Sequence, residues 1–308
     1  MLSHASAGAP ASASGASNGT QREGAFPPSD DEADQHARCA SSSTIGWLRS
    51  LLVMELFDSL FDDEMLVRRP QTPAAAALAD HLALRNAYRS LLATMVVPDR
   101  QLAEVARHVP AGAGIPVSVV ISGGAGGLLG LARRDLPGID IVSAEPALRD
   151  FDDLAGSAAR AVSAAAELDS EIAIFVELPY APGWEAAVEL VEASGLYAKI
   201  AAELAEPRQT AEQLSILIEA DLPFKISSRF GTDWLTLLTA VDALIDGASL
   251  DEATTLMQTD DDDQVRSRVS TWTPTTQSRI RHRIQRLGTD RVGDVINDCG
   301  AVDQSRDR

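Results

Sequence analysis

Residues 196–202 read LYAKIAA and residues 222–228 read LPFKISS, and each stretch follows a segment with helical periodicity. Both stretches are short, mainly apolar and centred on one lysine. Apolar runs of this length, separated by helices, are typical of strands that are buried on both faces of a parallel sheet. We therefore expect two strands of one parallel sheet, each contributing a lysine.

Lys199 and Lys225 are the only lysines among the 26 lysine and arginine residues of this 308-residue chain. An arginine supplies a permanent positive charge, whereas a lysine amine can lose its proton and attack a carbonyl carbon. The use of lysine at only these two positions therefore marks them as candidates for chemistry.

The same alternation of strand and helix extends towards the N-terminus. Six strands are predicted, at residues 94–97, 116–121, 139–144, 172–178, 197–202 and 224–227, with helices at 99–108, 126–134, 150–168, 183–193 and 210–220. Strands that alternate with helices in this way form a parallel sheet with right-handed crossovers. The expected fold class is therefore α/β, a parallel (β/α) barrel-like domain.

The flanking segments leave the closure of this barrel open. Residues 1–43 are rich in small and acidic residues and predict a disordered tail, because they cannot bury enough apolar surface to fold. A single domain would span 44–308, with N-terminal helices in 44–93, βα repeats in 94–230 and a mainly helical part in 231–308. An incomplete barrel or an open parallel sheet remains an alternative to a closed one.

Two of these flanking predictions bear on strand count. Residues 44–66 show helical periodicity, but Asp58, Asp62, Asp63 and Glu64 crowd the end of the segment, where the helix dipole disfavours acidic side chains. Residues 274–287 also predict a helix. A weak seventh strand is expected at 291–296.

Composition narrows the expected partners. The formal net charge is −19 and the isoelectric point is about 4.6, which disfavours nucleic acid and anionic membranes as partners. Cys39 and Cys299 are too few for a disulfide scaffold, and no signal peptide or membrane span is evident. We expect a cytoplasmic protein with a small-molecule substrate, and a homo-oligomer is compatible with the apolar face of 44–66.

The carboxyl ends of parallel strands carry the active site in barrels and in open α/β sheets. Glu145, Glu177, Lys199 and Lys225 all lie at or near such ends. One interpretation is a Schiff-base site in which Lys225 attacks a carbonyl, Lys199 lowers the pKa of Lys225, and Glu177 or Glu145 moves protons. The alternatives are a structural pair of a lysine with Glu177, or lysines that bind a phosphate or carboxylate.

A glycine-rich stretch, SGGAGGLLG at 122–130, lies between a predicted strand and helix. Gly123, Gly124 and Gly126 would let backbone amides approach an anion, and Ser227 and Ser228 could add hydroxyl groups to such a site. A plain tight turn is the alternative, and the spacing fits a dinucleotide fingerprint only in part. Nothing in the sequence predicts a metal or a cofactor.

Residues 61–302 resemble an uncharacterised family of actinobacterial α/β-barrel-like proteins. The resemblance rests on MVVP at 95–98, FVELP at 175–179, AKI at 198–200, PFK at 223–225 and LGT at 287–289. Family members follow the two lysines with LRTGG and ATAGLHH, whereas this chain has IAAEL and ISSRFGT. The resemblance implies a barrel, and these departures favour as an alternative a diverged or non-catalytic binding protein with an anion pocket.

Residues 196–228 also resemble deoxyribose-phosphate aldolase, a class I aldolase barrel. In that family a KVI strand is followed by a KTSTG strand that carries the Schiff-base lysine, and KISS at 225–228 matches this second strand in part. The resemblance implies a lyase or aldolase-type enzyme that acts on a small carbonyl compound, with or without a phosphate group, and that uses Lys225 as its nucleophile.

Overall fold

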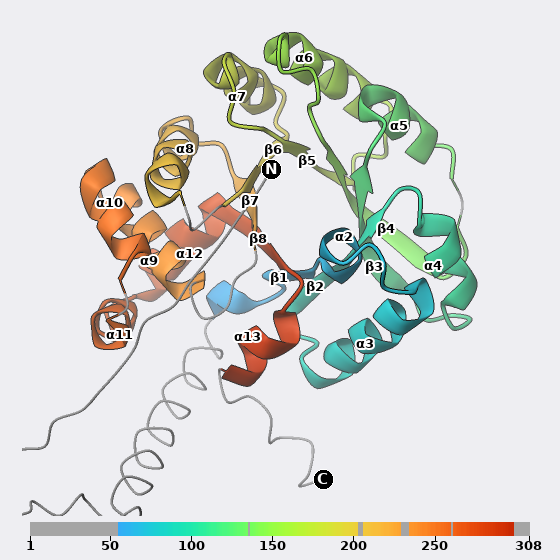
Figure 1. Ribbon diagram of the computed structural model, residues 1–308, viewed down its shortest axis with the longest axis horizontal. Helices are drawn as coiled ribbons and strands as arrows, with labels where there is room; N and C mark the ends of the chain where they lie inside the picture. Colours follow the sequence, from blue (N-terminus) through green and yellow to red (C-terminus); the bar gives the residue numbers. More distant parts are fainter. Residues whose placement is uncertain (1–54, 135, 203–205, 229–233, 260, 299–308) are drawn as a thin grey trace, which may run out of the picture. The chain divides into compact units, whose positions relative to one another are not determined.

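A computed structural model describes residues 55–298 except 135, 203–205, 229–233 and 260. Eight parallel strands close into one barrel, each paired with the next and the last with the first (Figure 1). The predicted α/β barrel is therefore confirmed, and its closure is complete. The strands are β1 (Phe61–Asp63), β2 (Leu92–Pro98), β3 (Ile115–Ile121), β4 (Ile139–Pro146), β5 (Ala173–Glu177), β6 (Tyr197–Ala201), β7 (Phe224–Ser227) and β8 (Ile284–Thr289).

Helices lie between the strands and surround the barrel (Figure 1). They are η1 (Glu55–Phe57), α2 (Met65–Arg68), α3 (Ala74–Ala87), α4 (Leu102–His108), α5 (Gly124–Leu131), α6 (Leu154–Ala165), α7 (Trp184–Ala193), α8 (Pro207–Glu219), α9 (Trp234–Ile245), α10 (Leu250–Met257), α11 (Asp262–Ser270), α12 (Pro274–Arg283) and α13 (Val292–Asp298). The expected tail at 1–43 and both cysteines lie outside the described residues.

The first strand was missed by sequence periodicity. Phe61–Asp63 is β1, where the pattern of 44–66 predicts the end of a helix. The acidic side chains explain the difference, since Asp62 meets a lysine inside the barrel instead of facing a helix carboxyl end. A strand of three residues is too short to show an alternating pattern, and Phe61 continues the helical spacing that precedes it.

The last strand was also hidden in a predicted helix. Helix α12 ends at Arg283, and β8 begins at Ile284 with extended backbone. The guanidinium of Arg281 donates to the carbonyls of Ile284 and Gln285, so the side chain binds the backbone groups where helix gives way to strand. The weak strand expected at 291–296 is wrong, because most of it belongs to α13.

Alternation within each strand separates an apolar core from a polar barrel interior. Val117, Val119 and Ile121 of β3 are fully buried in the apolar layer between the barrel and the helices. Ser118, on the opposite face of the same strand, is equally buried and donates a hydrogen bond to Glu145 inside the barrel. The hydrophobic core therefore lies outside the barrel wall, and the interior is available for charged groups.

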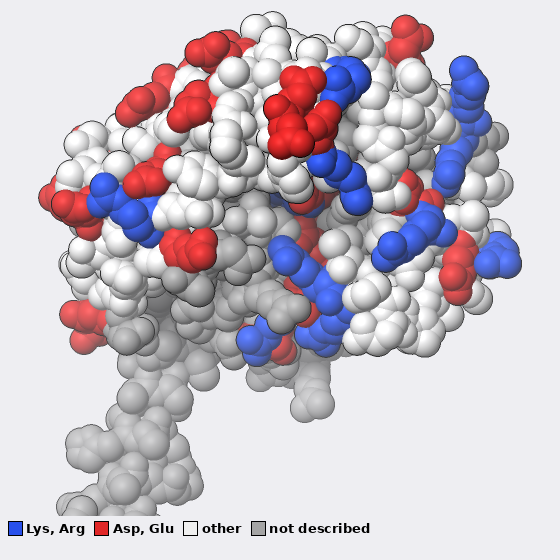
Figure 2. Space-filling view, turned by 45° about the horizontal axis from the view of Figure 1, so that its top comes forward, with Lys and Arg blue, Asp and Glu red and all other residues white. Residues whose placement is uncertain are grey.

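The surface carries charges of both signs despite the net charge of −19. On the face drawn in Figure 2, basic and acidic side chains lie close together, and several of each sign line the hollow near its centre. Among the helices of the described residues, none is both long enough and apolar enough to cross a membrane.

The seam that joins β1 to the C-terminal half depends on aromatic packing. Trp234, at the start of α9, makes edge-on contacts with Phe57 and Phe61, with ring centroids 5.4 and 5.5 Å apart.

We expect Trp234→Ala to lower the free energy of unfolding by about 3–5 kcal/mol, measured by urea denaturation. Phe151→Ala, at a side chain that is 57% exposed, should change it by less than about 0.5 kcal/mol. Equal effects of the two substitutions would contradict this account of the seam.

Candidate functional site

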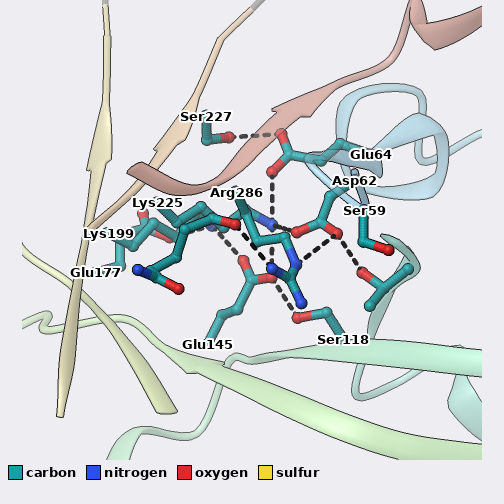
Figure 3. Close-up of polar contacts among 12 residues, drawn as sticks. Ser59, Asp62, Glu64, Ser118, Glu145, Glu177, Lys199, Lys225, Ser227 and Arg286 are labelled. Atoms are coloured by element: carbon teal, nitrogen blue, oxygen red, sulfur yellow. Dashed lines mark hydrogen bonds and ion pairs between the residues drawn. The ribbon is translucent and has the colours of Figure 1, made fainter. Parts of the chain in front are cut away.

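Four charged side chains form one row across four neighbouring strands. Glu177 of β5 is in register with Lys199 of β6, Lys199 with Lys225 of β7, and Lys225 with Arg286 of β8. Residues in register on adjacent strands point to the same side of the sheet, so all four side chains enter the barrel interior (Figure 3). Three cations therefore stand side by side and would repel one another without carboxylates between them.

Lys225 is fully buried and is surrounded by carboxylates. Its Nζ lies 2.7 Å from Asp62 Oδ2, 2.8 Å from Glu145 Oε1 and 3.4 Å from Glu64 Oε1. Asp62 belongs to β1, Glu64 directly follows β1, and Glu145 belongs to β4. The ammonium group of Lys225 thus joins the first strand to the opposite side of the barrel.

Glu145 lies between the two lysines and contacts both. Lys199 Nζ lies 2.8 Å from Glu145 Oε2 and 2.9 Å from Glu177 Oε2, while Ser118 Oγ donates to Glu145 Oε1 at 2.5 Å. Glu145 is fully buried, whereas the side chain of Glu177 is 36% exposed. Of the two lysines, Lys199 is therefore the one whose carboxylate partner reaches solvent.

The charges of the cluster stabilise one another strongly. Burial by itself would lower the pKa of Lys199 and of Lys225, but the neighbouring carboxylates outweigh burial and raise both. Burial likewise opposes the carboxylate form of Glu145, yet the two lysines hold its pKa well below the usual range. At neutral pH both lysines are ammonium groups and Glu145 is a carboxylate.

This result corrects one part of the sequence-based hypothesis. Lys199 was expected to lower the pKa of Lys225 by the proximity of a like charge. It does act in that direction, but its effect is smaller than that of Asp62, Glu145 or Glu64, and the pKa of Lys225 is raised overall.

A second set of contacts fixes Glu64 at the junction of β7, β8 and α2. Ser227 Oγ donates to Glu64 Oε2 at 2.5 Å, and Arg68 donates both to Ser227 Oγ at 2.7 Å and to Glu64 Oε2 at 3.3 Å. The Glu64 carboxylate lies directly over Gly288, where an added Cβ would come within 2.0 Å of Glu64 Oε1. A side chain at this position of β8 would therefore displace the Glu64 carboxylate.

Asp62 completes the cluster. Thr94 Oγ1 donates to Asp62 Oδ1 at 2.6 Å, and Arg286 Nε lies 3.8 Å from the same oxygen. With Arg68 included, the connected cluster holds four cationic and four carboxylate side chains among the residues that the structure describes. They are Arg68, Lys199, Lys225 and Arg286, with Asp62, Glu64, Glu145 and Glu177.

The structure brings together the predicted residues Glu145, Glu177, Lys199 and Lys225. The predicted residue Ser227 joins the same cluster through its hydrogen bond to Glu64. Ser228 is buried just beyond β7, where its backbone N–H donates to the carbonyl of Gly288. Its predicted role in anion binding has no side-chain contact to support it among the described residues. The catalytic roles of the four charged residues remain predictions.

The glycine-rich stretch lies apart from the lysines. Gly123 and Gly124 begin α5 and line a pocket of about 380 Å³ together with Arg149 and Arg160. Asp99 accepts hydrogen bonds from both the backbone N–H and the hydroxyl of Ser122, so a carboxylate already occupies part of this turn. Gly126, inside α5, does not line the pocket. The predicted anion cradle remains a prediction.

Sequence reasoning missed several members of the cluster. Asp62 and Glu64 were assigned to a helix end, and Arg286 to the helix predicted at 274–287. The unfavourable position of an acidic run at a helix carboxyl end was the available signal for the first two. No local sequence signal marks Ser118 or Thr94, since a buried hydroxyl in a strand can be assigned to a site only once its hydrogen-bond partner is known.

Comparisons with protein-family models, with curated proteins and with solved structures return no match to this chain. Among the described residues, no three side chains of the types that bind metals are grouped to hold an ion. The fold and the site define the class by themselves. This is a closed barrel of eight parallel strands whose charged interior contains every lysine of the chain.

Removing Lys225 should destabilise the barrel, because three buried carboxylates would be left facing one another. We expect Lys225→Met to lower the free energy of unfolding at pH 7.5 by about 3–5 kcal/mol. The deficit should shrink below about pH 5, where the carboxylates take up protons. The matched control is Arg160→Met, at an exposed ion pair, with an expected change below about 1 kcal/mol. A deficit that stays constant with pH would contradict the proposed cause.

The wild-type protein should show a stability plateau between about pH 5 and pH 10. The raised lysine pKa values stabilise the folded state fully below the unfolded lysine value of about 10.4, and this contribution is lost as pH rises through the folded values. The lowered pKa of Glu145 contributes above the unfolded value of about 4.3 and is lost as pH falls. Urea midpoints measured across pH 3–11 test both edges, and a steady slope through the neutral range would contradict this account.

Gly288→Ala should displace the Glu64 carboxylate and cost about 1–3 kcal/mol of stability, as overpacking does. Gly130→Ala is the matched control, because it lies in α5 with open space around it and should stabilise the protein by about 0.4–1 kcal/mol. Thermal denaturation of both variants gives the comparison, and a neutral Gly288→Ala would show that Glu64 moves away freely.

Proposed function

We propose that this chain is an enzyme of the lyase or aldolase type that forms a Schiff base between a barrel lysine and a small carbonyl compound. One observation carries the proposal: the two oxygens of the buried Glu145 each lie 2.8 Å from a different lysine Nζ. A carboxylate in contact with both ammonium groups can accept the proton that either must lose before it attacks a carbonyl. The resemblance of residues 196–228 to class I aldolases supports the same chemistry.

The proposed reaction begins with transfer of a proton from the reacting lysine to Glu145, which passes it on to water. The neutral amine nitrogen attacks the carbonyl carbon, and one proton moves from this nitrogen to the carbonyl oxygen to give a carbinolamine. A proton taken from water and passed on by Glu177 lets the hydroxyl leave as water, and a protonated C=N bond forms. In a lyase, this iminium group accepts the electron pair of the C–C bond that breaks. A carboxylate removes the hydroxyl proton of the departing carbonyl product, and protonation and hydrolysis of the enamine release the remainder.

The geometry favours Lys199 as the attacking residue. Its side chain is 5% exposed, it contacts two carboxylates, and it adjoins the partly exposed Glu177. Lys225 has no exposed surface and contacts three carboxylates. Lys225 would then act as the neighbouring cation that favours a neutral Lys199 once Glu145 has taken the proton. Sequence reasoning predicts the reverse assignment, and one experiment decides between them.

Borohydride reduction in the presence of small aldehydes and ketones tests the proposal. Because the chain has only two lysines, peptide mapping by mass spectrometry assigns any reduced adduct to Lys199, to Lys225 or to the N-terminal amine. We expect an adduct on Lys199 that is absent from Lys199→Met and retained, at a lower rate, in Lys225→Met. No lysine adduct with any carbonyl between pH 6 and 10, in protein shown to be folded by circular dichroism, would overturn the proposal.

The rate of trapping should rise with pH from 7 to 10. The pKa of each lysine is raised, so the fraction of neutral amine is small at neutral pH and increases with every step towards alkaline pH. A rate that is flat over this range would show that the reacting lysine is already neutral at pH 7. This would contradict the resting state described above, in which both lysines are ammonium groups.

A non-catalytic role is the second candidate, and the charge balance of the cluster favours it. Four carboxylates face four cations, and the raised lysine pKa values are those of a stabilising network. In that case the chain would be a diverged binding or accessory protein with an anion pocket. A large loss of stability in Lys225→Met, together with an absence of lysine adducts, would favour this candidate.

A further inference from the structure

Arg286 differs from the other cations of the cluster because its guanidinium is only loosely held. Its two polar contacts among the described residues are the 3.8 Å approach of Nε to Asp62 and a 2.8 Å hydrogen bond from Nη1 to the carbonyl of Gln285. The side chain is 27% exposed. Nη2 and one N–H of Nη1 therefore have no partner among the residues that the structure describes.

Arg68, the other arginine of the cluster, provides the contrast. Its Nε donates to Glu64 at 3.3 Å and its Nη2 donates to Ser227 at 2.7 Å, so one edge of its guanidinium binds two groups of the barrel wall. Arg68 therefore holds the wall of the barrel together, whereas Arg286 has donors to spare beside the lysines.

The position of Arg286 suits a group that binds one end of a substrate. It is in register with Lys225, which is in turn in register with Lys199, so the guanidinium and the two amines lie along one row. The paired N–H groups of a guanidinium match the two oxygens of a carboxylate. We propose that Arg286 binds the carboxylate of an oxo acid whose carbonyl group reacts with the lysine pair. This inference rests on the proposed Schiff-base function.

The surrounding charges favour a carboxylate over a phosphate group. Asp62 lies beside Arg286, and Glu64 and Glu145 are linked to it through Lys225. A phosphate dianion would meet twice the repulsion of a carboxylate from these acidic groups. A monoanion is therefore the better match for the guanidinium of Arg286.

The row also bears on the length of the substrate. Neighbouring strands lie about 4.8 Å apart, so Arg286 is one strand spacing from Lys225 and two from Lys199. Attack by Lys199 therefore calls for an acid whose carbonyl lies several bonds from the carboxylate, such as 4-oxobutanoate. Attack by Lys225 calls for a shorter 2-oxo acid such as pyruvate.

Borohydride trapping with matched pairs of compounds tests the inference. 4-Oxobutanoate and butanal have the same aldehyde group and differ in the carboxylate, and pyruvate and hydroxyacetone form a second pair. We expect one of the two acids to be trapped roughly tenfold to a hundredfold faster than its neutral partner. Arg286→Gln should abolish this preference, so that the acid and its neutral partner are trapped at equal rates by the variant, and Arg286→Lys should retain part of the preference. The exposed Arg160→Gln is the control and should retain all of it.

The outcomes separate this inference from the proposed function. Adducts that form equally fast with acids and neutral compounds, or a preference that survives in Arg286→Gln, would overturn the role of Arg286 and leave the Schiff base intact. Faster trapping of glyceraldehyde 3-phosphate than of either acid would also overturn it. Calorimetric titration with butanoate, which cannot form a Schiff base, tests the carboxylate site by itself. Binding that is lost in Arg286→Gln supports the site even if no adduct forms, and an absence of binding to the wild-type protein counts against it.

Discussion

The structure depends on the neutralisation of three cations that the strand registers place next to one another. Lys199, Lys225 and Arg286 occupy one row of the barrel interior, where like charges in a medium of low polarity repel strongly. Glu145 neutralises both lysines, because one of its carboxylate oxygens contacts Lys199 and the other contacts Lys225. Asp62 contacts Lys225 from the opposite side. Because Asp62 lies on β1, this contact forms only when β1 closes the barrel by pairing with β8. Barrel closure and charge balance are thus one requirement, since an open sheet would leave Lys225 without its partner from the first strand.

Much of the fold follows from local sequence, and the reasons for the failures are physical. The six central strands are apolar runs bounded by helices, and each was predicted from its own residues. β1 and β8 were missed because the helical spacing of the sequence before each strand extends into it, so that Phe61 and Leu287 appear to continue a helical face. Nothing in a segment of three residues distinguishes a strand from a helix turn. What settles the matter is pairing with distant strands, as when Phe61 lies opposite Leu287.

The candidate site was predictable to the same extent. Glu145, Glu177, Lys199 and Lys225 were found because the carboxyl ends of neighbouring parallel strands converge, a rule that needs only the strand assignments. Asp62 and Arg286 belong to the two missed strands and Glu64 directly follows the first of them, so all three residues were missed together with these strands. The pKa of Lys225 was predicted in the wrong direction for the same reason. A lysine beside Lys199 alone would lose its proton more easily, whereas the carboxylates from the start of the barrel reverse the balance.

The restriction of lysine to the barrel interior has a consequence for how this protein can be studied. Since Lys199 and Lys225 are almost fully buried, apart from the N-terminus no primary amine of the chain lies on its surface. Reagents that modify amines, and cross-linkers that join them, will therefore leave the folded barrel nearly untouched. The rate at which such a reagent reaches Lys225 measures how often the barrel opens, because exposure of this side chain requires separation of strands that close the ring. The chain thus contains its own chemical reporter of barrel opening, without any engineered label.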